Sequence, residues 1–185
     1  FVIASPEART ILDRTCIASL GEWRDDWWAE AHREGIVAIA THSWDHAHET
    51  LPEVAQRHQK KGTFEGIDTY GDADAQIRRA EDYIEAKLGR PSAHVFAYPY
   101  GAFIEYLCQE YLPRYQHEHR QRAAVTTHDE VLTEGSDRWK VPRFVCGWHW
   151  KDPDGLRYIL ESTRIHVKWR SRLGTRVRGW AKWAS

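Results

Sequence analysis

"GIVAIATHSWDHAH", residues 35–48, places three histidines and one aspartate directly after a short apolar run. A run of about four to eight apolar residues bounded by turn-forming residues is typical of a buried β-strand, so we predict a strand over Ile36–Ala40. In parallel α/β folds, ligand sites lie at the carboxyl ends of the strands. The stretch therefore predicts that the histidines stand at the functional edge of a sheet.

Short apolar runs alternate with helical patterns along the rest of the chain. Ser5 as N-cap and Pro6 at the first helical position predict one helix start, and Asp152 followed by Pro153 predicts another. Helices are predicted over 5–14, 22–35, 50–62, 72–88, 102–112 and 155–162, and further strands over 94–98, 123–127 and 141–145. This strand-then-helix order indicates an α/β fold with a parallel sheet or barrel.

The composition is that of an ordinary globular protein. Of the 185 residues, 42% are hydrophobic and 29% are charged, which argues against intrinsic disorder. No stretch approaches the roughly 18 consecutive apolar residues of a membrane-spanning helix, and no leading segment has the pattern of a signal peptide. The 3 cysteines are widely spaced and odd in number, so we expect buried apolar residues rather than a disulfide framework.

The end of the chain has a strongly basic composition. After Glu161 there is no acidic residue, and the basic residues are Arg164, Lys168, Arg170, Arg172, Arg176, Arg178 and Lys182. Cations interleaved with tryptophans are typical of segments that lie at a membrane interface. We therefore predict a folded domain over 1–163 and a basic tail over 164–185 that contacts an anionic membrane, the alternative being a solvated end. No nucleic-acid partner is expected, because no recognised binding motif accompanies the tail.

His42 and His46 are four residues apart. In a helical turn or a tight loop, this spacing aims both imidazoles at one point, and neutral imidazole is a common ligand of zinc. A histidine pair alone also fits a surface pair at a helix start, with Ser43 or Thr41 as the cap. His48 is either a third ligand or a residue that faces substrate or solvent.

"HSWDH" followed downstream by "FAYPYG", each at the end of a predicted strand, resembles the NodB-homology polysaccharide deacetylases of carbohydrate esterase family 4. The resemblance covers roughly residues 1 to 160 and implies a distorted (β/α) barrel with fewer than eight strands. It implies that His42 and His46 bind a divalent metal, most commonly zinc. It also implies that Pro99, Tyr100 and Gly101 line the substrate groove, with the Tyr100 backbone N–H binding the oxyanion.

The sequence departs from the family pattern in several places. The family's opening strand ends in Thr-Phe-Asp-Asp, which supplies the catalytic base and a metal ligand, and nothing here corresponds. Because "FVIAS" resembles the next strand of the family, we expect an N-terminally incomplete barrel with the aspartates upstream of Phe1. The adjacent acids Asp25 and Asp26 lie in a helical pattern and are interpreted as solvated surface residues.

Other family positions have substitutes in this chain. Ala97 stands where many members have an arginine, and Arg143 either orients the missing aspartate instead or pairs with a structural carboxylate. The family's late histidine, the general acid, has no clean match; His128 and His149 are the candidates, and each also fits an ordinary surface or core histidine.

Two further groups of residues are assigned from their position. Trp44 and Trp148 fall near the predicted rim, where flat rings stack on sugar faces. His117 and His119, in the charged segment "QHEHR", are expected in solvent.

These observations predict a metal-dependent N-deacetylase acting on an acetamido sugar of a bacterial surface polysaccharide or its precursor. The substrate is then an N-acetylated saccharide, and the location is the bacterial cytoplasm or the membrane periphery. One alternative is a catalytically inactive homologue that keeps a sugar-binding groove, which Ala97 favours. Another is a metal-dependent hydrolase of an amide outside carbohydrate.

Overall fold

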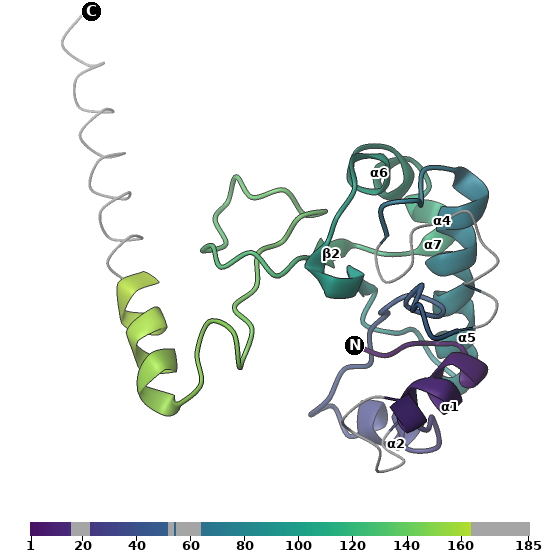
Figure 1. The fold of residues 1–185 in the computed structure, drawn as a ribbon, viewed down its shortest axis with the longest axis horizontal. Coiled ribbons are helices and arrows are strands. Elements are labelled where there is room, and N and C mark those ends of the chain that lie inside the picture. The colour runs from purple at the N-terminus through teal and green to yellow at the C-terminus, as the bar shows by residue number, and fades with distance from the viewer. Residues whose placement is uncertain (16–22, 52–53, 55–63, 164–185) are drawn as a thin grey trace, which may run out of the picture. The chain divides into compact units, whose positions relative to one another are not determined.

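The computed structural model describes residues 1–15, 23–51, 54 and 64–163. The chain divides into two compact units, the first formed by Phe1–His128 and Leu132–Arg143, the second by Asp129–Val131 and Phe144–Ser185 (Figure 1). The predicted basic tail, 164–185, lies outside the described residues, so its separation from a domain over 1–163 stays a prediction. None of the helices in the described part of the chain has the length and apolar character needed to cross a membrane.

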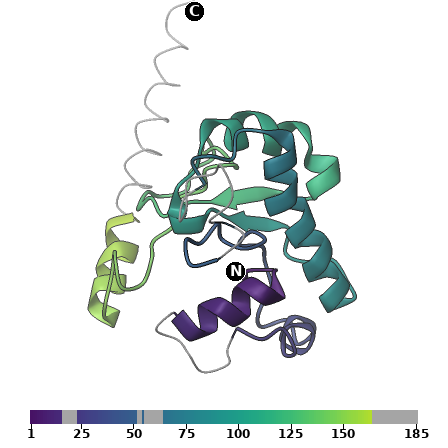
Figure 2. The same ribbon diagram turned by 45° about the vertical axis from the view of Figure 1, so that its right-hand side comes forward.

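The first unit contains a small parallel sheet. Strand β1 (Val95–Ala97) pairs in parallel with β2 (Ala123–Val125) (Figure 2). Isolated parallel bridges extend this pairing in both directions, namely Val2 with Thr41, Thr41 with Phe96, and Val125 with Val141. The predicted parallel α/β arrangement is therefore confirmed, whereas its closure into a barrel stays a prediction.

The predicted strands over 94–98 and 123–127 form in shortened versions, whereas none of the residues in the predicted strand Ile36–Ala40 is in a strand. In the predicted strand Ile36–Ala40, the side chain of Ile36 is 91% exposed and that of Val37 is 45% exposed, while Ile39 and Ala40 are buried. Backbone hydrogen bonds to neighbouring segments begin at the carbonyls of Ile39 and Ala40, and the bridges of this segment are at Thr41. The predicted strand over 141–145 is likewise reduced to one bridge at Val141.

Local capping signals place two helix starts correctly. Helix α1 (Pro6–Thr15) begins after Ser5, whose Oγ accepts the N–H of Ala8 at 3.1 Å. In the second unit, a helix over 153–163 begins after Asp152, whose Oδ1 accepts the N–H of Gly155 at 2.7 Å. Helix α2 (Trp28–Arg33) is much shorter than the predicted 22–35.

The single helix predicted over 72–88 is divided into α4 (Tyr70–Gln76) and α5 (Arg78–Leu88). Ile77, with φ −108° and ψ −59°, separates the two pieces, and α5 ends at Gly89 as predicted. Helix α4 packs with Ile77 against a core cluster around Phe96, whereas the apolar face of α5 packs against a different cluster that contains Trp28. Because of the break, α4 and α5 each pack against a different hydrophobic cluster.

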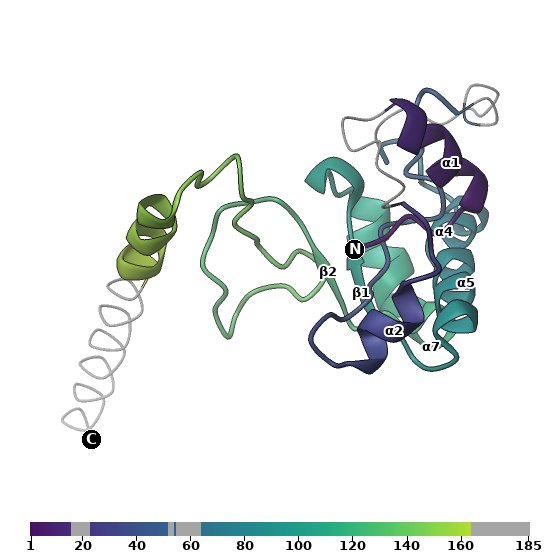
Figure 3. The ribbon, with the colours of Figure 1, turned by 90° about the horizontal axis from the view of Figure 1, so that it is seen from below.

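The helices α4 and α5 run along one side of the two strands, and α1 and α2 lie near the N-terminal segment (Figure 1, Figure 3). A π-helix, η2 (Tyr106–Tyr111), continues into α6 (Leu112–Arg114) and α7 (Gln116–His119). Contrary to the expectation of a solvated segment, His119 is fully buried. Its Nδ1 accepts the N–H of Gln121 at 3.0 Å, and burial lowers its pKa to about 4.

Arg9 connects α1 to the segment that precedes α2 and to α2 itself. Its buried guanidinium donates to Asp25 at 2.9 Å and to the carbonyl of Trp23 at 3.2 Å, and it lies 4.6 Å from the ring centroid of Trp28. Asp25 is thus a partner of a buried cation rather than a solvated surface residue. Burial alone would raise the pKa of Asp25, but hydrogen bonds from Tyr83 and Arg9 hold it well below its usual range.

We expect Arg9→Met to lower the free energy of unfolding by about 3 kcal/mol, because it leaves a partly buried carboxylate without its guanidinium partner. Urea denaturation measures this change. Arg14→Met, on the exposed side of the same helix, serves as the control and should change the stability by less than about 0.5 kcal/mol. Equal effects of the two substitutions would contradict the proposed role of Arg9.

Candidate functional site

The loop that follows Thr41 is held in an unusual backbone conformation. The N–H of His42 donates to the carbonyl of Val2 at 2.8 Å, so the loop starts where the parallel segments pair. Ser43, His46 and Ala47 all have positive φ values, of 72°, 64° and 47°. The buried Oγ of Ser43 accepts the N–H of His46 at 2.9 Å, which closes the loop into a tight turn. Positive φ in non-glycine residues costs energy and is concentrated at functional sites.

The turn brings the imidazoles of His42 and His46 together, with ring centroids 4.8 Å apart and ring planes at 67°. Nδ1 of His42 lies 2.7 Å from the carbonyl of Ala97. A carbonyl only accepts, so Nδ1 carries the proton and the lone pair of Nε2 is available to a ligand. Nδ1 of His46 is buried and has no hydrogen-bond partner among the described residues. Both rings therefore fit the role of nitrogen ligands to a metal.

Both imidazoles are neutral at ordinary pH. Burial lowers the pKa of His42 to about 4, and the positive charge of Arg143 contributes in the same direction. Burial, followed by the neighbouring His42 and His48, lowers the pKa of His46 to about 3. Because a histidine must be unprotonated to bind a metal, the site is in its binding-competent form at neutral pH.

The turn η1 (Pro99–Gly101) packs against this loop. Tyr100 has φ 57° and ψ 10°, and its ring lies edge-on to His46 at a centroid distance of 4.5 Å. Gly101 has a φ of 70°, and a Cβ at this position would lie 2.0 Å from Oγ1 of Thr127. Glycine is therefore required here both for its backbone conformation and for the close approach of Thr127.

A cavity of about 550 Å³ opens beside the histidines. Its polar lining residues are Arg9, His42, His46, His48 and Tyr100. Its walls are mainly apolar and include Phe1, Ile3, Leu12, Trp23, Trp27 and Ile39. The predicted metal-binding loop and the predicted "PYG" turn thus share one cavity within the first unit.

Trp44 packs against side chains of α5. Its ring packs against α5, with the guanidinium carbon of Arg79 3.7 Å from the ring centroid and the ring of Tyr83 at 5.9 Å. It is not among the residues that line the cavity of the histidines. These contacts assign Trp44 a packing role, and its stacking on a sugar stays a prediction.

Arg143 has a half-buried guanidinium, whose Nε donates to the carbonyl of Thr126 at 3.1 Å. Its charge acts on His42, and burial lowers its own pKa. Among the described residues, no carboxylate lies within ion-pair distance of Arg143, so the alternative of a structural ion pair finds no support there. Its role in orienting an aspartate stays a prediction.

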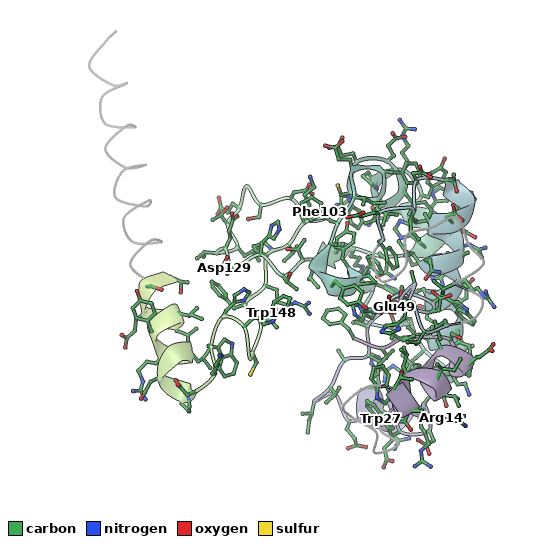
Figure 4. The ribbon with its side chains drawn as sticks, viewed as in Figure 1. Arg14, Trp27, Glu49, Phe103, Asp129 and Trp148 are labelled. Carbon is green, nitrogen blue, oxygen red and sulfur yellow. The ribbon has the colours of Figure 1, made fainter. Side chains whose placement is uncertain are left out.

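The two candidate general acids belong to different units. His128, in the first unit, is exposed, and its ring lies 5.4 Å from that of Phe103. His149 belongs to the second unit, where its Nδ1 accepts the N–H of Val145 at 2.7 Å. Trp148, in the same unit, is 68% exposed (Figure 4). The roles of His149 and Trp148 stay predictions.

A second group of charged residues was missed by the sequence patterns. Glu81, Glu85 and His94 place their ligand atoms within 4.8 Å of one another, a group that could hold a cation. However, the hydroxyls of Thr41 and Ser92 donate to Glu81, and Arg120 pairs with Glu85 at 3.1 Å. The spacing of the two glutamates on one helix face was the available signal. These contacts tie α5 to the starts of the strands.

Comparison with known proteins identifies a family for this chain. The family model described as "Polysaccharide deacetylase" matches residues 15–114, a range that contains the histidine pair and the turn at Pro99–Gly101. No curated protein and no solved structure matches the chain.

Gly101→Ala should lower the free energy of unfolding by about 3 kcal/mol or more, because it combines a left-handed backbone with an overlap on Thr127. Gly89→Ala is the matched control, because Gly89 has a φ of 65° and nothing within 4 Å of its missing Cβ. We expect a loss of about 1 kcal/mol for the control in urea denaturation. Equal losses would show that the contact with Thr127 does not matter.

The metal-free protein should lose stability as the pH falls below about 6.5. The folded-state pKa values of His42 and His46 are about 4 and 3, against 6.5 when unfolded, so the unfolded chain takes up protons first. Between pH 6.5 and the folded-state pKa of each histidine, that histidine lowers the free energy of unfolding by up to about 1.4 kcal/mol for each unit by which the pH falls. Urea denaturation in chelator from pH 7.5 to 4.5 measures it, and the His42→Asn, His46→Asn double variant should show a shallower decline. If stability falls equally steeply with pH in the unmodified protein and in the double variant, His42 and His46 are not the groups responsible.

Proposed function

The chain belongs to the polysaccharide deacetylase family, a group of hydrolases acting on amide bonds, and from this we propose that it is a metal-dependent N-deacetylase of acetamido sugars. The substrate that we propose is part of a bacterial surface polysaccharide or its precursor. The observation that carries the proposal is the pair of neutral imidazoles, His42 and His46, which line one cavity together with Tyr100.

His42 and His46 would hold a divalent metal, and zinc suits a pair of neutral imidazoles. The hydrogen bond from His42 Nδ1 to Ala97 fixes the ring and its tautomer, as is common for metal-binding histidines. A metal bound there would polarise the acetamide carbonyl and make water a stronger nucleophile. The family's aspartate pair, which supplies the base and a further ligand, has no counterpart in this sequence.

The remaining roles are proposed for Tyr100, Pro99, Gly101 and Arg143 of the first unit and for the two candidate general acids. The backbone N–H of Tyr100 would donate to the oxyanion that forms at the acetamide carbon, a contribution of about 3 kcal/mol for one well-placed donor. Pro99 and Gly101 hold that turn in place. Arg143 would orient the base, and His128 or His149 would protonate the leaving amine.

The second candidate function is a sugar-binding homologue without catalysis. Ala97 in place of the family's arginine and the absence of a clear late histidine motif favour it. The same cavity would then bind an acetylated saccharide without cleaving it. Metal binding alone does not distinguish the two candidates, but acetate release does.

Substitution of either proposed metal-binding histidine should weaken metal binding strongly and abolish hydrolysis. We expect the full protein, with any residues that precede Phe1, to bind one zinc ion and to release acetate from an N-acetylated oligosaccharide. His42→Asn or His46→Asn should weaken zinc binding by more than the roughly 100-fold that loss of an outer-shell partner costs, because each substitution removes a ligand. Isothermal titration calorimetry and an acetate assay measure the two effects. His117→Asn is the control, because that side chain is 77% exposed.

Three outcomes distinguish the candidates. Zinc-dependent acetate release that is lost in both histidine variants supports the deacetylase. Saccharide binding without acetate release supports the inactive homologue. A chain that binds no zinc, or whose zinc binding survives both substitutions, would show that the proposed metal site is wrong.

A further inference from the structure

Asp45 lies in the centre of the histidine loop and is 4% exposed. Its Oδ1 accepts the backbone N–H of Ala47 at 2.9 Å, immediately after His46. This bond holds the part of the loop in which His46 and Ala47 both have positive φ values. The conformation that directs the His46 ring toward His42 therefore depends on where the Asp45 carboxylate is placed.

Gln76, the last residue of α4, contacts the same carboxylate oxygen. Its Nε2 donates to Oδ1 of Asp45 at 2.9 Å, across 31 positions of the sequence. The Gln76 side chain is 2% exposed, so neither partner is free to rearrange toward water. A buried charge-assisted hydrogen bond of this length is among the stronger polar contacts in a protein.

The contact is not an efficient way to stabilise the fold. Oε1 of Gln76 is buried without a hydrogen-bond partner in the described part of the chain. A buried amide oxygen left unpaired costs about 1–3 kcal/mol, which offsets much of the benefit of the bond to Asp45. An apolar side chain of the same length would avoid that cost. Such a side chain would, however, lack the N–H group that donates to Oδ1 of Asp45.

We propose that Gln76 is a positioning residue for the metal site, acting through Asp45 on the loop that carries His46. The proposal rests on the proposed function of the histidine pair. Among the described residues, Gln76 makes no hydrogen bond to either histidine, and it lies outside the "HSWDH" and "FAYPYG" segments. Replacing a residue that hydrogen-bonds a metal ligand directly typically changes metal affinity by about 10- to 100-fold, and Gln76 acts one residue further from the ligand, through Asp45.

The test uses the full chain with Gln76→Met, which keeps the length of the side chain and removes both polar atoms. Gln121→Met is a matched control. Gln121 is also fully buried, its Nε2 donates to a carboxylate oxygen of Glu81 at 2.7 Å, and its Oε1 also lacks a partner among the described residues. Each substitution removes a buried bond from an amide to a carboxylate, and only the bond of Gln76 reaches Asp45 inside the histidine loop. Gln121 Nε2 also donates to Oγ1 of Thr41, which precedes the loop, at the longer distance of 3.5 Å.

We expect Gln76→Met to weaken zinc binding by about 10- to 100-fold and to change the absorption spectrum of bound cobalt. Gln121→Met should stay within about threefold of the unmodified chain. Hydrogen exchange of the Ala47 amide in the metal-free protein gives a readout that needs no metal, and it should be at least about tenfold faster in Gln76→Met only. Gln76→Asn, whose amide is too short to reach Asp45, should behave as Gln76→Met does.

Zinc affinity and Ala47 exchange that are unchanged in folded Gln76→Met would overturn the proposal, as would equal effects in Gln121→Met. Failure of both Gln76 variants to fold, with Gln121→Met folded, would assign Gln76 to the core and also overturn it. If His42→Asn abolishes zinc binding while Gln76→Met does not affect it, only the positioning role fails. If the unmodified chain binds no zinc, the proposed function fails as well.

Discussion

The backbone of Ala97 joins the sheet to the site. Its N–H donates to the carbonyl of Thr41 at 2.9 Å, which is part of the parallel pairing, and its carbonyl accepts Nδ1 of His42 at 2.7 Å. One residue therefore contributes both to the register of the segments and to the tautomer of His42. Neither bond uses the side chain of Ala97, so this arrangement does not depend on which side chain stands at position 97.

The loops at the site store strain that the core has to offset. The left-handed residues Ser43, His46 and Ala47 lie in one loop, and Tyr100 lies in the turn that packs on it. Such conformations persist only where the surroundings over-determine them. Here the buried hydroxyl of Ser43, the carboxylate of Asp45 and the close approach of Thr127 to the turn supply that constraint.

The two ends of the paired segments have opposite electrostatic character. At the starts of β1 and β2, buried Glu81 is surrounded by donors, including Thr41 and Gln121, and charges are paired. At the carboxyl ends, the imidazoles are neutral because burial disfavours their protonated forms. Thr41 connects the two ends, because its side chain contacts Glu81 and its backbone leads directly into His42. The paired charges around Glu81 and the neutral histidines of the candidate site therefore lie at different places along the same short segments.

The sequence by itself determined the features that depend on neighbouring residues. The helix starts at Ser5 and Asp152, the αL residue Gly89 and the spacing of the two histidines follow from chemistry within a few positions. Only the tertiary structure decided which apolar and charged residues are buried. Ile36 is exposed, the helix breaks at Ile77, and Asp25, His119 and Glu81 are enclosed, because their partners lie on other elements. The contact between Gln76 and Asp45 spans 31 positions, and no local pattern specifies a pairing at that distance.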